Sequence, residues 1–266
     1  MNGEPGAEVE PGTDVVLSLE DISFHYGGQQ VLDGINLRLE RGMFLGLIGP
    51  NGSGKTTLLK VALGLLRPQR GVVRWFGQPL TRPGQFGSRV AYVPQLSQAY
   101  VRPFPVTVRE LVAAGRVPRR RLLRPLDRGD REAVEAALAA VGMADRRDDR
   151  LSDLSGGQQQ RAFIARALAA DAEVLLLDEP TSGIDAAAQE RFYDLLGRLQ
   201  RDTGRTLLLV SHDLAAITRR VTHLACINRR LLCSGTVSEV AHDPEGLARA
   251  FGDLRLIAHS HGEVPS

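Results

Sequence analysis

The sequence predicts an α/β fold built around a parallel sheet, and three features of the chain lead to this prediction. Runs of consecutive apolar residues at 44–48, 174–177 and 207–210 are typical of parallel strands covered on both faces. Segments with helical periodicity follow the first two of these runs. Residues 97–170 combine helical periodicity with few strand formers, which indicates a helical insertion within the α/β domain.

The composition argues against several classes of protein. The 266 residues are enough for full cores in one or two domains, and a net charge of +2 predicts no nucleic-acid partner. The chain begins without a secretory signal, and no apolar run approaches the roughly 20 residues of a membrane span. We therefore expect a chain that is soluble alone and that acts at a membrane only through a partner subunit. Cys226 and Cys233 lie in apolar surroundings and are expected to be reduced core residues.

The N-terminal part of the chain predicts a tail followed by antiparallel strands. Residues 1–14 are rich in Gly, Pro and acidic residues, as in disordered tails. Short alternating runs between 15 and 39 predict an antiparallel β region, with turns at Gly27-Gly28 and at Asp33-Gly34. Tyr26 stands at the tip of one run. Its ring is placed either to stack on a base or to pack the strand end, and the spacing leaves both alternatives open.

A glycine-rich loop follows the apolar run at 44–48. Residues 49–57 fit G-x-x-x-x-G-K-[ST], the loop that cradles phosphates between a strand and a helix. Its glycines allow backbone N–H groups to turn toward a phosphate, and the start of the helix adds partial positive charge. Lys55 is predicted to reach the β- and γ-phosphates of a nucleotide, and the Thr56 hydroxyl to bind Mg²⁺. The predicted nucleotide contacts in this loop are Gly49, Asn51, Gly52, Ser53, Gly54, Lys55, Thr56 and Thr57. The helix is expected at 57–66, with an apolar face formed by Leu58, Leu59, Ala62, Leu65 and Leu66.

The chain then returns to strands before it enters the helical insertion. Strands are predicted at 71–77 and 90–93, and the second ends at Pro94-Gln95. Within the insertion, the apolar periodicity predicts helices at 106–114, 131–141 and 158–169. Residues 116–128 are rich in Arg and Pro but have no interleaved aromatics, so we expect a solvated surface segment.

Two acidic residues follow the apolar run at 174–177. Ligands of parallel α/β sheets bind at the carboxyl ends of the strands, where Asp178 and Glu179 are predicted to lie. Asp178 suits the role of holding Mg²⁺, directly or through water. The side chain of Glu179 points elsewhere and is placed to act as general base toward an attacking water.

Residues 154–158, Leu-Ser-Gly-Gly-Gln, form a second unusual stretch. Ser155 and two glycines precede a helix, which makes another anion-binding helix start, although an ordinary serine N-cap has the same pattern. One nucleotide meets both helix starts either if they converge within one protomer or if two protomers face each other head to tail.

Two polar residues at strand ends complete the predicted site. His212 ends the 207–210 strand, which should lie beside the phosphate-loop strand, so it is a candidate partner of the γ-phosphate or a plain structural histidine. Gln95 is placed to contact Mg²⁺ or the water and to report occupancy to the helices. Beyond them, a helix is predicted at 185–200, a hairpin about Asn228-Arg229, and a terminal helix and tail from Thr236.

Together these motifs resemble the nucleotide-binding subunit of ATP-binding-cassette (ABC) transporters, over roughly Leu17 to Gly235. The resemblance implies a P-loop NTPase (RecA-like) core with an antiparallel β subdomain and an inserted α-helical subdomain. The core would take residues 15–96 and 171–235, the helical signature subdomain 97–170, and the terminal helix and tail 236–266.

The same resemblance implies roles for single residues. Tyr26 would stack on adenine, and Ser155 and Gly157 would contact the γ-phosphate held by a second copy of the chain, with Gly156 and Gln158 beside them. Residues 182–185 would form the D-loop that crosses the dimer seam, where Gly183 and Ile184 replace the commoner Ala and Leu. Asp185 is expected to act there and also as an N-cap.

Within that family, residues 93–95, 104–110 and Gly115 look like those of the zinc and manganese importers. The resemblance implies transmembrane permease subunits and an extracytoplasmic solute-binding protein as partners, with the chain at the cytoplasmic face of the membrane. A subunit for an iron chelate or an exporter, or a soluble cassette ATPase without a transport role, remains an alternative. His259 and His261 in the tail could chelate a divalent metal or be plainly solvated.

Overall fold

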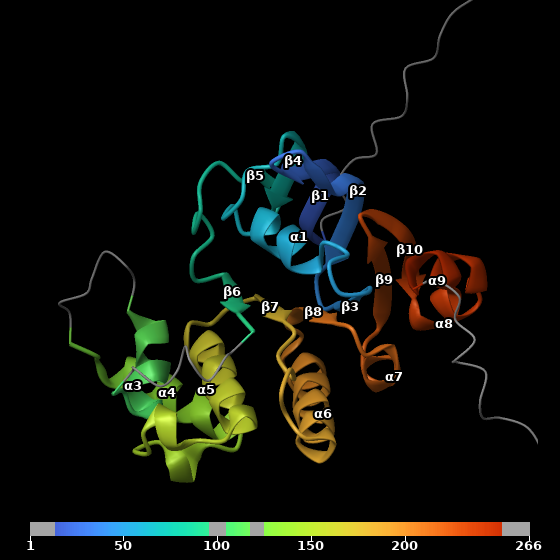
Figure 1. Ribbon diagram of the computed structural model, residues 1–266. Helices are drawn as coiled ribbons and strands as arrows, with labels where there is room; N and C mark the ends of the chain where they lie inside the picture. Colours follow the sequence, from blue (N-terminus) through green and yellow to red (C-terminus); the bar gives the residue numbers. More distant parts are fainter. Residues whose placement is uncertain (1–13, 96–104, 118–124, 252–266) are drawn as a thin grey trace, which may run out of the picture.

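The structure is a computed structural model that describes residues 14–95, 105–117 and 125–251 (Figure 1). The predictions for the tail at 1–13, for 97–104, for most of the Arg-rich segment, and for His259 and His261 lie outside these residues. No helix within the described ranges is both long and apolar enough to cross a membrane.

The larger sheet of the described residues has six strands in the order β10-β9-β3-β8-β7-β6. All neighbouring pairs are parallel except β9 and β10, which form the predicted hairpin about Asn228-Arg229. The strands are β3 (Phe44–Ile48), β6 (Val90–Val93), β7 (Val174–Asp178), β8 (Thr206–Ser211), β9 (His223–Asn228) and β10 (Arg230–Thr236). The prediction of parallel strands from continuous apolar runs is confirmed, because β3, β7 and β8 are buried at every position.

The two faces of this sheet line two separate cores. Alternate residues of a strand point to opposite faces, so Leu175 and Leu177 of β7 join one cluster while Val174 and Leu176 join the other. The first cluster includes residues of the helices drawn below the sheet in Figure 1. The second is closed by α1 (Lys55–Ala62) and by the antiparallel sheet. The carboxyl ends of β3, β6, β7 and β8 therefore lie at one edge, between these two layers.

The smaller sheet is antiparallel, in the order β2-β1-β4-β5. Its strands are β1 (Val15–Tyr26), β2 (Gln29–Glu40), β4 (Arg70–Trp75) and β5 (Gln78–Pro79). The turn predicted at Gly27-Gly28 is confirmed, but the turn predicted at Asp33-Gly34 is wrong. Gly34 lies inside β2 with φ 60°, where the pairing register with β1 is irregular, so it marks an irregularity within one long strand.

Helix α1 begins and ends earlier than predicted. It ends at Ala62 because Gly64 takes a left-handed φ of 71°, a conformation that commonly ends helices. Leu65 consequently lies outside the helix and is 55% exposed, so its assignment to the buried face is wrong.

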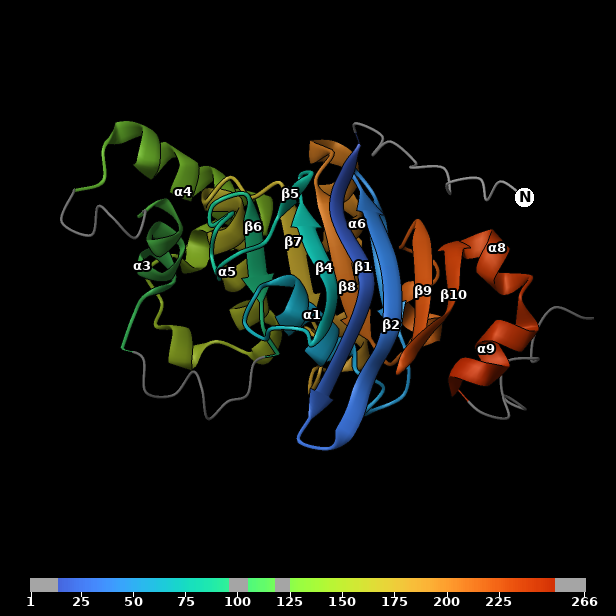
Figure 2. The same ribbon diagram turned by 90° about the horizontal axis from the view of Figure 1, so that it is seen from above.

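The helical region forms one end of the molecule, and Figures 1 and 2 both place α3, α4 and α5 there together. These helices are α3 (Val108–Ala113), α4 (Arg128–Ala140) and α5 (Gly156–Ala169), with short 3-10 helices at Ala114–Arg116, Ala144–Arg146 and Leu151–Asp153. Each of these three α-helices begins with a capping box, which explains why α4 and α5 start before their apolar periodicity does. Gly115 allows the chain to cross α5 closely, since a Cβ there would lie 2.3 Å from the carbonyl oxygen of Arg166.

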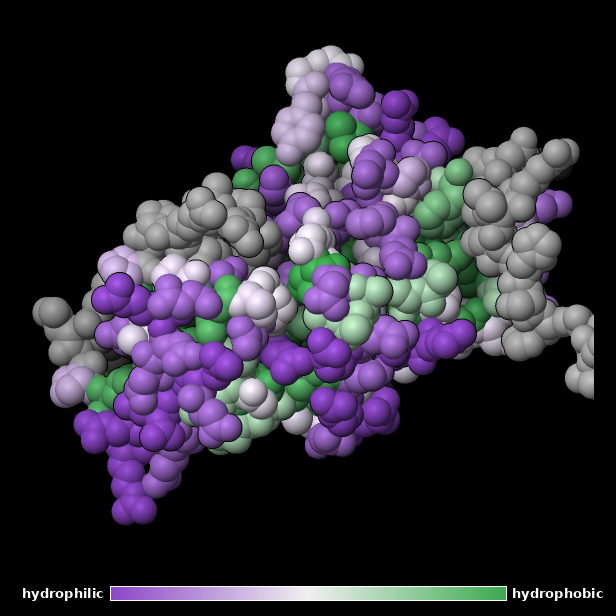
Figure 3. Space-filling view, turned by 60° about the horizontal axis from the view of Figure 1, so that its bottom comes forward, coloured by the Kyte–Doolittle hydropathy of each residue, from purple (hydrophilic) through white to green (hydrophobic). Residues whose placement is uncertain are grey.

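The remaining helices are α6 (Ala186–Thr203), α7 (Leu214–Ile217), α8 (Val237–Ala241) and α9 (Pro244–Phe251). Phe192, Leu196 and Leu199 of α6 pack under the large sheet, and α8 and α9 lie beside β10 at the end opposite α3 and α4 (Figure 2). Figure 3 shows the face formed by the lower helices. Hydrophilic residues cover most of it, with smaller hydrophobic areas between them, as expected for elements that bury one face.

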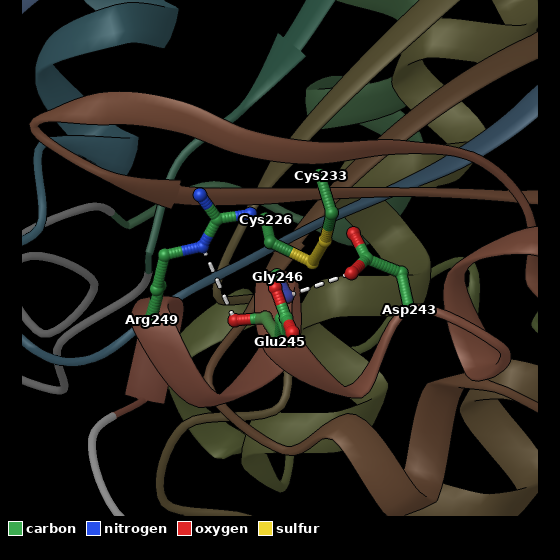
Figure 4. The surroundings of a disulfide bond; sticks show 6 residues. All are labelled: Cys226, Cys233, Asp243, Glu245, Gly246 and Arg249. Carbon is green, nitrogen blue, oxygen red and sulfur yellow. Dashed lines mark hydrogen bonds between the residues drawn. A yellow bond between two sulfur atoms is a disulfide. The ribbon is translucent and has the colours of Figure 1, made fainter.

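The structure joins Cys226 and Cys233 in a disulfide across the β9–β10 hairpin (Figure 4). Both side chains are buried, as predicted, but the expectation that they are reduced is wrong here. Apolar surroundings do not reveal that strand pairing places the two residues side by side. The two residues are directly opposite each other, with Cα atoms 5.0 Å apart, within the range that a disulfide spans.

Candidate active site

The phosphate loop connects β3 to α1 and depends on its glycines for two different reasons. Gly52 and Gly54 have φ of 78° and 102°, in the left-handed region that favours glycine. Gly49 is needed for space instead, because a Cβ there would lie 2.1 Å from the carbonyl oxygen of Ile227. The sequence motif does not distinguish the three glycines, whereas the structure shows that Gly52 and Gly54 are needed for their φ angles and Gly49 for space.

The tip of the β9–β10 hairpin supports this loop. The backbone N–H of Arg229 donates to the carbonyl oxygen of Ser53 at 3.0 Å, and the N–H of Asp33 in β2 donates to the carbonyl oxygen of Arg229 at 2.8 Å. A Cβ on Gly54 would meet Leu32 of β2 at 2.8 Å. The loop is thus wedged between β2 and the hairpin, two supports that the sequence motif does not reveal.

Lys55 is the first residue of α1 and is almost completely buried. Its Nζ donates to the carbonyl oxygens of Gly49 and Pro50 at 2.8 and 2.9 Å, and it lies 3.7 Å from Oε1 of Glu179. Burial lowers the pKa of the Lys55 ammonium, and the nearby carboxylates of Glu179 and Asp178 act in the opposite direction.

Asp178 ends β7 and lies next to α1, with only 2% of its surface exposed. The Thr56 hydroxyl donates to its Oδ1 at 3.0 Å and the Tyr92 hydroxyl donates to its Oδ2 at 3.1 Å. Burial raises the pKa of the Asp178 carboxyl, and the two hydroxyl donors oppose that shift. The sequence predicts Tyr92 only as a strand residue, and its contact with Asp178 is visible only in the structure.

Glu179 lies between two basic side chains. Its Oε1 faces Lys55, and its Oε2 lies 3.6 Å from Nδ1 of His212, a side chain that is 56% exposed. The backbone of Glu179 has φ 42°, an uncommon left-handed conformation for a non-glycine residue. A pocket beside it is lined by Glu179, Ser182, Ile184 and His212. The structure therefore brings the predicted Lys55, Glu179 and His212 together.

Gln95 is exposed just beyond the end of β6 and contacts a residue of the segment 182–185. Its Nε2 donates to the Ser182 hydroxyl at 3.1 Å. Among the described contacts, none joins Gln95 to Asp178 or Thr56. This hydrogen bond joins Gln95, where the chain leaves β6 for the helical region, to the segment 182–185.

The second helix start is an ordinary capping box in this structure. The Ser155 hydroxyl accepts from the N–H of Gln158 at 3.4 Å, and the Gln158 side chain accepts from the N–H of Ser155 at 2.9 Å. Ser155 and Gly156 are exposed, and the side chain of Ile184 lies beside Gly157. Asp185 caps α6, as predicted, by accepting from the N–H of Ala188 at 2.8 Å.

The remaining predicted contacts lie at the surface. Tyr26 is 48% exposed, and its ring packs edge-on against Phe24 with centroids 4.8 Å apart. Asn51 is exposed and Thr57 is half-buried. Both alternatives for Tyr26 remain compatible with this arrangement.

The chemistry of these side chains fits a nucleotide phosphate and a magnesium ion. A buried ammonium at a helix start suits a phosphate, and a hydroxyl beside a carboxylate supplies the oxygen ligands that Mg²⁺ prefers. Within the described residues, the buried Ser53 hydroxyl also has no hydrogen-bond partner, which leaves an unused donor in the loop. No group of three or more His, Cys, Asp or Glu in the same ranges forms a separate metal site.

Comparison with known proteins identifies the family. The family model described as ABC transporter matches residues 32–182. The chain belongs to the ABC transporter family. It is an ATP hydrolase of the ABC type, with an α/β P-loop NTPase fold.

Relatives with curated names cover most of the chain. The zinc uptake system ATP-binding protein ZurA of Listeria innocua is 42% identical over 229 residues, which cover 85% of this chain and 88% of that protein. The manganese transport system ATP-binding protein MntA of Synechocystis sp. is 39% identical over 243 residues, or 91% of this chain and 92% of that protein. Among solved structures, cbiO1 from Clostridium perfringens, part of the ABC transporter complex cbiONQ, matches with a TM-score of 0.77 and 27% identity over 91% of this chain and 96% of that one.

Proposed function

We propose that this chain is the ATP-hydrolysing subunit of an importer for a divalent metal, zinc or manganese. The main support for ATP hydrolysis is a contact in the structure. Lys55, Glu179 and His212 meet at the carboxyl ends of β3, β7 and β8. The zinc and manganese systems named for the relatives support the choice of cargo. A subunit for an iron chelate or an exporter remains the alternative, since the permease selects the cargo.

Each residue of the site has a chemical role in this proposal. Lys55 and the loop N–H groups bind the β- and γ-phosphates of ATP, and Tyr26 stacks on the adenine. Glu179 accepts the proton of the attacking water. Its carboxylate is held for this role by Lys55 on one side and His212 on the other. His212 hydrogen-bonds the γ-phosphate. Thr56, Asp178 and Gln95 would hold Mg²⁺, which when bound neutralises charge on the phosphate oxygens.

Two copies of the chain are proposed to complete each site. The loop tip at Asn51-Gly52 is exposed, and so are Ser155 and Gly156 at the start of α5. A head-to-tail pair would place Ser155, Gly156, Gly157 and Gln158 of one copy against the γ-phosphate held by the other. Residues 182–185 would cross the interface between the two copies. The contact between Gln95 and Ser182 would transmit nucleotide occupancy from this interface to the helical region.

The assembly would include transmembrane permease subunits and an extracytoplasmic solute-binding protein. The chain would lie at the cytoplasmic face of the membrane and contact the permease through its helical region. The relatives' names as ATP-binding components of uptake and transport systems support this arrangement.

The role of Glu179 is tested by Glu179→Gln. We expect hydrolysis to fall by about 10²–10⁴-fold, because the amide cannot accept the water proton, while ATP affinity stays within about twofold of wild type. Phosphate release and binding of a fluorescent ATP analogue measure the two effects. Glu190→Gln, at an exposed position of α6, is the matched control and should keep wild-type turnover. Unchanged turnover in Glu179→Gln would refute the assignment of the base.

A further inference from the structure

We propose that Tyr92 is a positioning residue for the metal-binding carboxylate of Asp178. The inference deepens the proposed function, because it rests on the magnesium role assigned to Asp178 there. Its basis is the hydrogen bond from the Tyr92 hydroxyl to Oδ2 of Asp178 at 3.1 Å, on the oxygen opposite the one that Thr56 contacts.

The strand register explains how Tyr92 reaches this carboxylate. Tyr92 in β6 pairs with Leu176 in β7, two residues before Asp178. Leu176 belongs to the core cluster on the α1 side of the sheet and Tyr92 packs against that cluster, so the ring lies on the face where Thr56 contacts Asp178. A side chain as long as tyrosine then spans the two remaining residues along the neighbouring strand.

The two hydroxyl donors fix the plane of the carboxylate. Asp178 is 2% exposed, so little bulk water is available to satisfy its oxygens. With one donor on each oxygen, rotation of the carboxylate would break a hydrogen bond that the surroundings cannot replace. Each oxygen keeps a further lone pair, so the orientation is set without using up the capacity to bind a cation.

Supporting partners of this kind matter because a metal ligand must be held in place before the ion arrives. Loss of a hydrogen-bonded partner of a ligating carboxylate typically weakens metal affinity by about 10–100-fold. A tyrosine that only fills space would lower stability on losing its hydroxyl and would leave metal affinity unchanged. Metal affinity therefore separates the two roles.

The experiment compares wild type with Tyr92→Phe, which removes the hydroxyl and keeps the ring. Tyr193→Phe is the matched control, since Tyr193 is 1% exposed and its hydroxyl is 2.9 Å from the Thr181 hydroxyl. Mn²⁺ binding is measured by electron paramagnetic resonance with a stoichiometric non-hydrolysable ATP analogue. ATP hydrolysis is measured as a function of free Mg²⁺, and analogue affinity is measured in a chelator.

We expect Tyr92→Phe to weaken Mn²⁺ binding by about tenfold and to raise the half-saturating Mg²⁺ concentration similarly, with little change in kcat at saturating Mg²⁺. Analogue affinity without metal should stay within about twofold, and Tyr193→Phe should retain wild-type metal binding. Wild-type metal binding in Tyr92→Phe would overturn the inference. A wild-type protein that bound the analogue without recruiting Mn²⁺ would instead overturn the magnesium site itself.

Discussion

At the scale of single residues, the site differs from the rest of the surface in how its charges are paired. Lys55 and Asp178 are 4% and 2% exposed, and each is held by hydrogen bonds that offset the cost of burying a charge. Most other ion pairs are at least partly exposed, and such pairs contribute little to stability. Glu173 lies between these two extremes of burial, since its side chain is 33% exposed, and it pairs with both Arg41 and Arg89.

The hydrogen bond from Arg89 and the pairing with Arg41 lower the pKa of the Glu173 carboxyl from 4.5 to about 2. The folded state therefore favours the charged form, and its stabilising effect is present above the usual pKa and is lost as the pH falls toward 2. Glu173→Gln should lower the free energy of unfolding by about 1 kcal/mol at pH 7, since the site is one-third exposed.

Urea unfolding at several pH values measures this effect. The difference between Glu173→Gln and wild type should shrink steadily between about pH 4.5 and the acid limit of folding. Glu132→Gln, which removes an exposed partner of Arg128 on α4, is the control and should change stability by less than about 0.5 kcal/mol. A difference that stayed constant with pH would show that the ionised carboxylate is not what stabilises the fold.

At the scale of elements, the hairpin β9–β10 and the phosphate loop depend on each other. Gly49→Ala would force the new Cβ to within 2.1 Å of the Ile227 carbonyl oxygen, which is backbone and cannot move alone. We expect the free energy of unfolding to fall by about 1–3 kcal/mol, as in other overpacked sites. Nucleotide affinity should fall as well, because the loop must shift.

Gly28→Ala is the matched control for this variant. It lies in the β1–β2 turn, where nothing would lie within 4 Å of a Cβ, and its φ is not in the left-handed region. Urea unfolding and nucleotide binding of the two variants give the comparison. If Gly49→Ala were as stable and bound nucleotide as well as Gly28→Ala, the close approach would have no consequence.

The elements of the sheet were predictable because their signal is local. Continuous apolar runs predict the bounds of β3, β7 and β8 to within a residue or two, and Asn228-Arg229 predicts the turn of the β9–β10 hairpin. Helix ends and irregularities were predicted less well. The left-handed Gly64 ends α1, and Gly34 sits within β2, and neither effect follows from apolar periodicity.

The supports of the site could not be predicted because they depend on strand order. Tyr92 reaches Asp178 only because β6 pairs with β7, and Arg229 reaches Ser53 only because β9 pairs with β3. The motif residues were identifiable because their spacing in sequence reflects one loop or one strand end. Their partners come from strands that are distant in sequence, and a local pattern contains no information about which strands are neighbours.

At the scale of the whole molecule, the described chain exposes two helix starts that are proposed to meet one nucleotide. The loop tip at Asn51-Gly52 belongs to the α/β part, and Ser155-Gly156 begins a helix of the helical region. The account requires two copies that bring these helix starts together, with ATP between Lys55 of one and Ser155 of the other. Hydrolysis at Glu179 would then release the pair.

The most direct test is the mass in solution of the Glu179→Gln variant, measured by light scattering after size-exclusion chromatography. Without nucleotide, the mass should correspond to one chain of 28.9 kDa. With saturating ATP and Mg²⁺ it should rise to twice that value, because ATP that is not hydrolysed keeps the pair closed. A mass that stays at that of a single chain under these conditions would contradict the account.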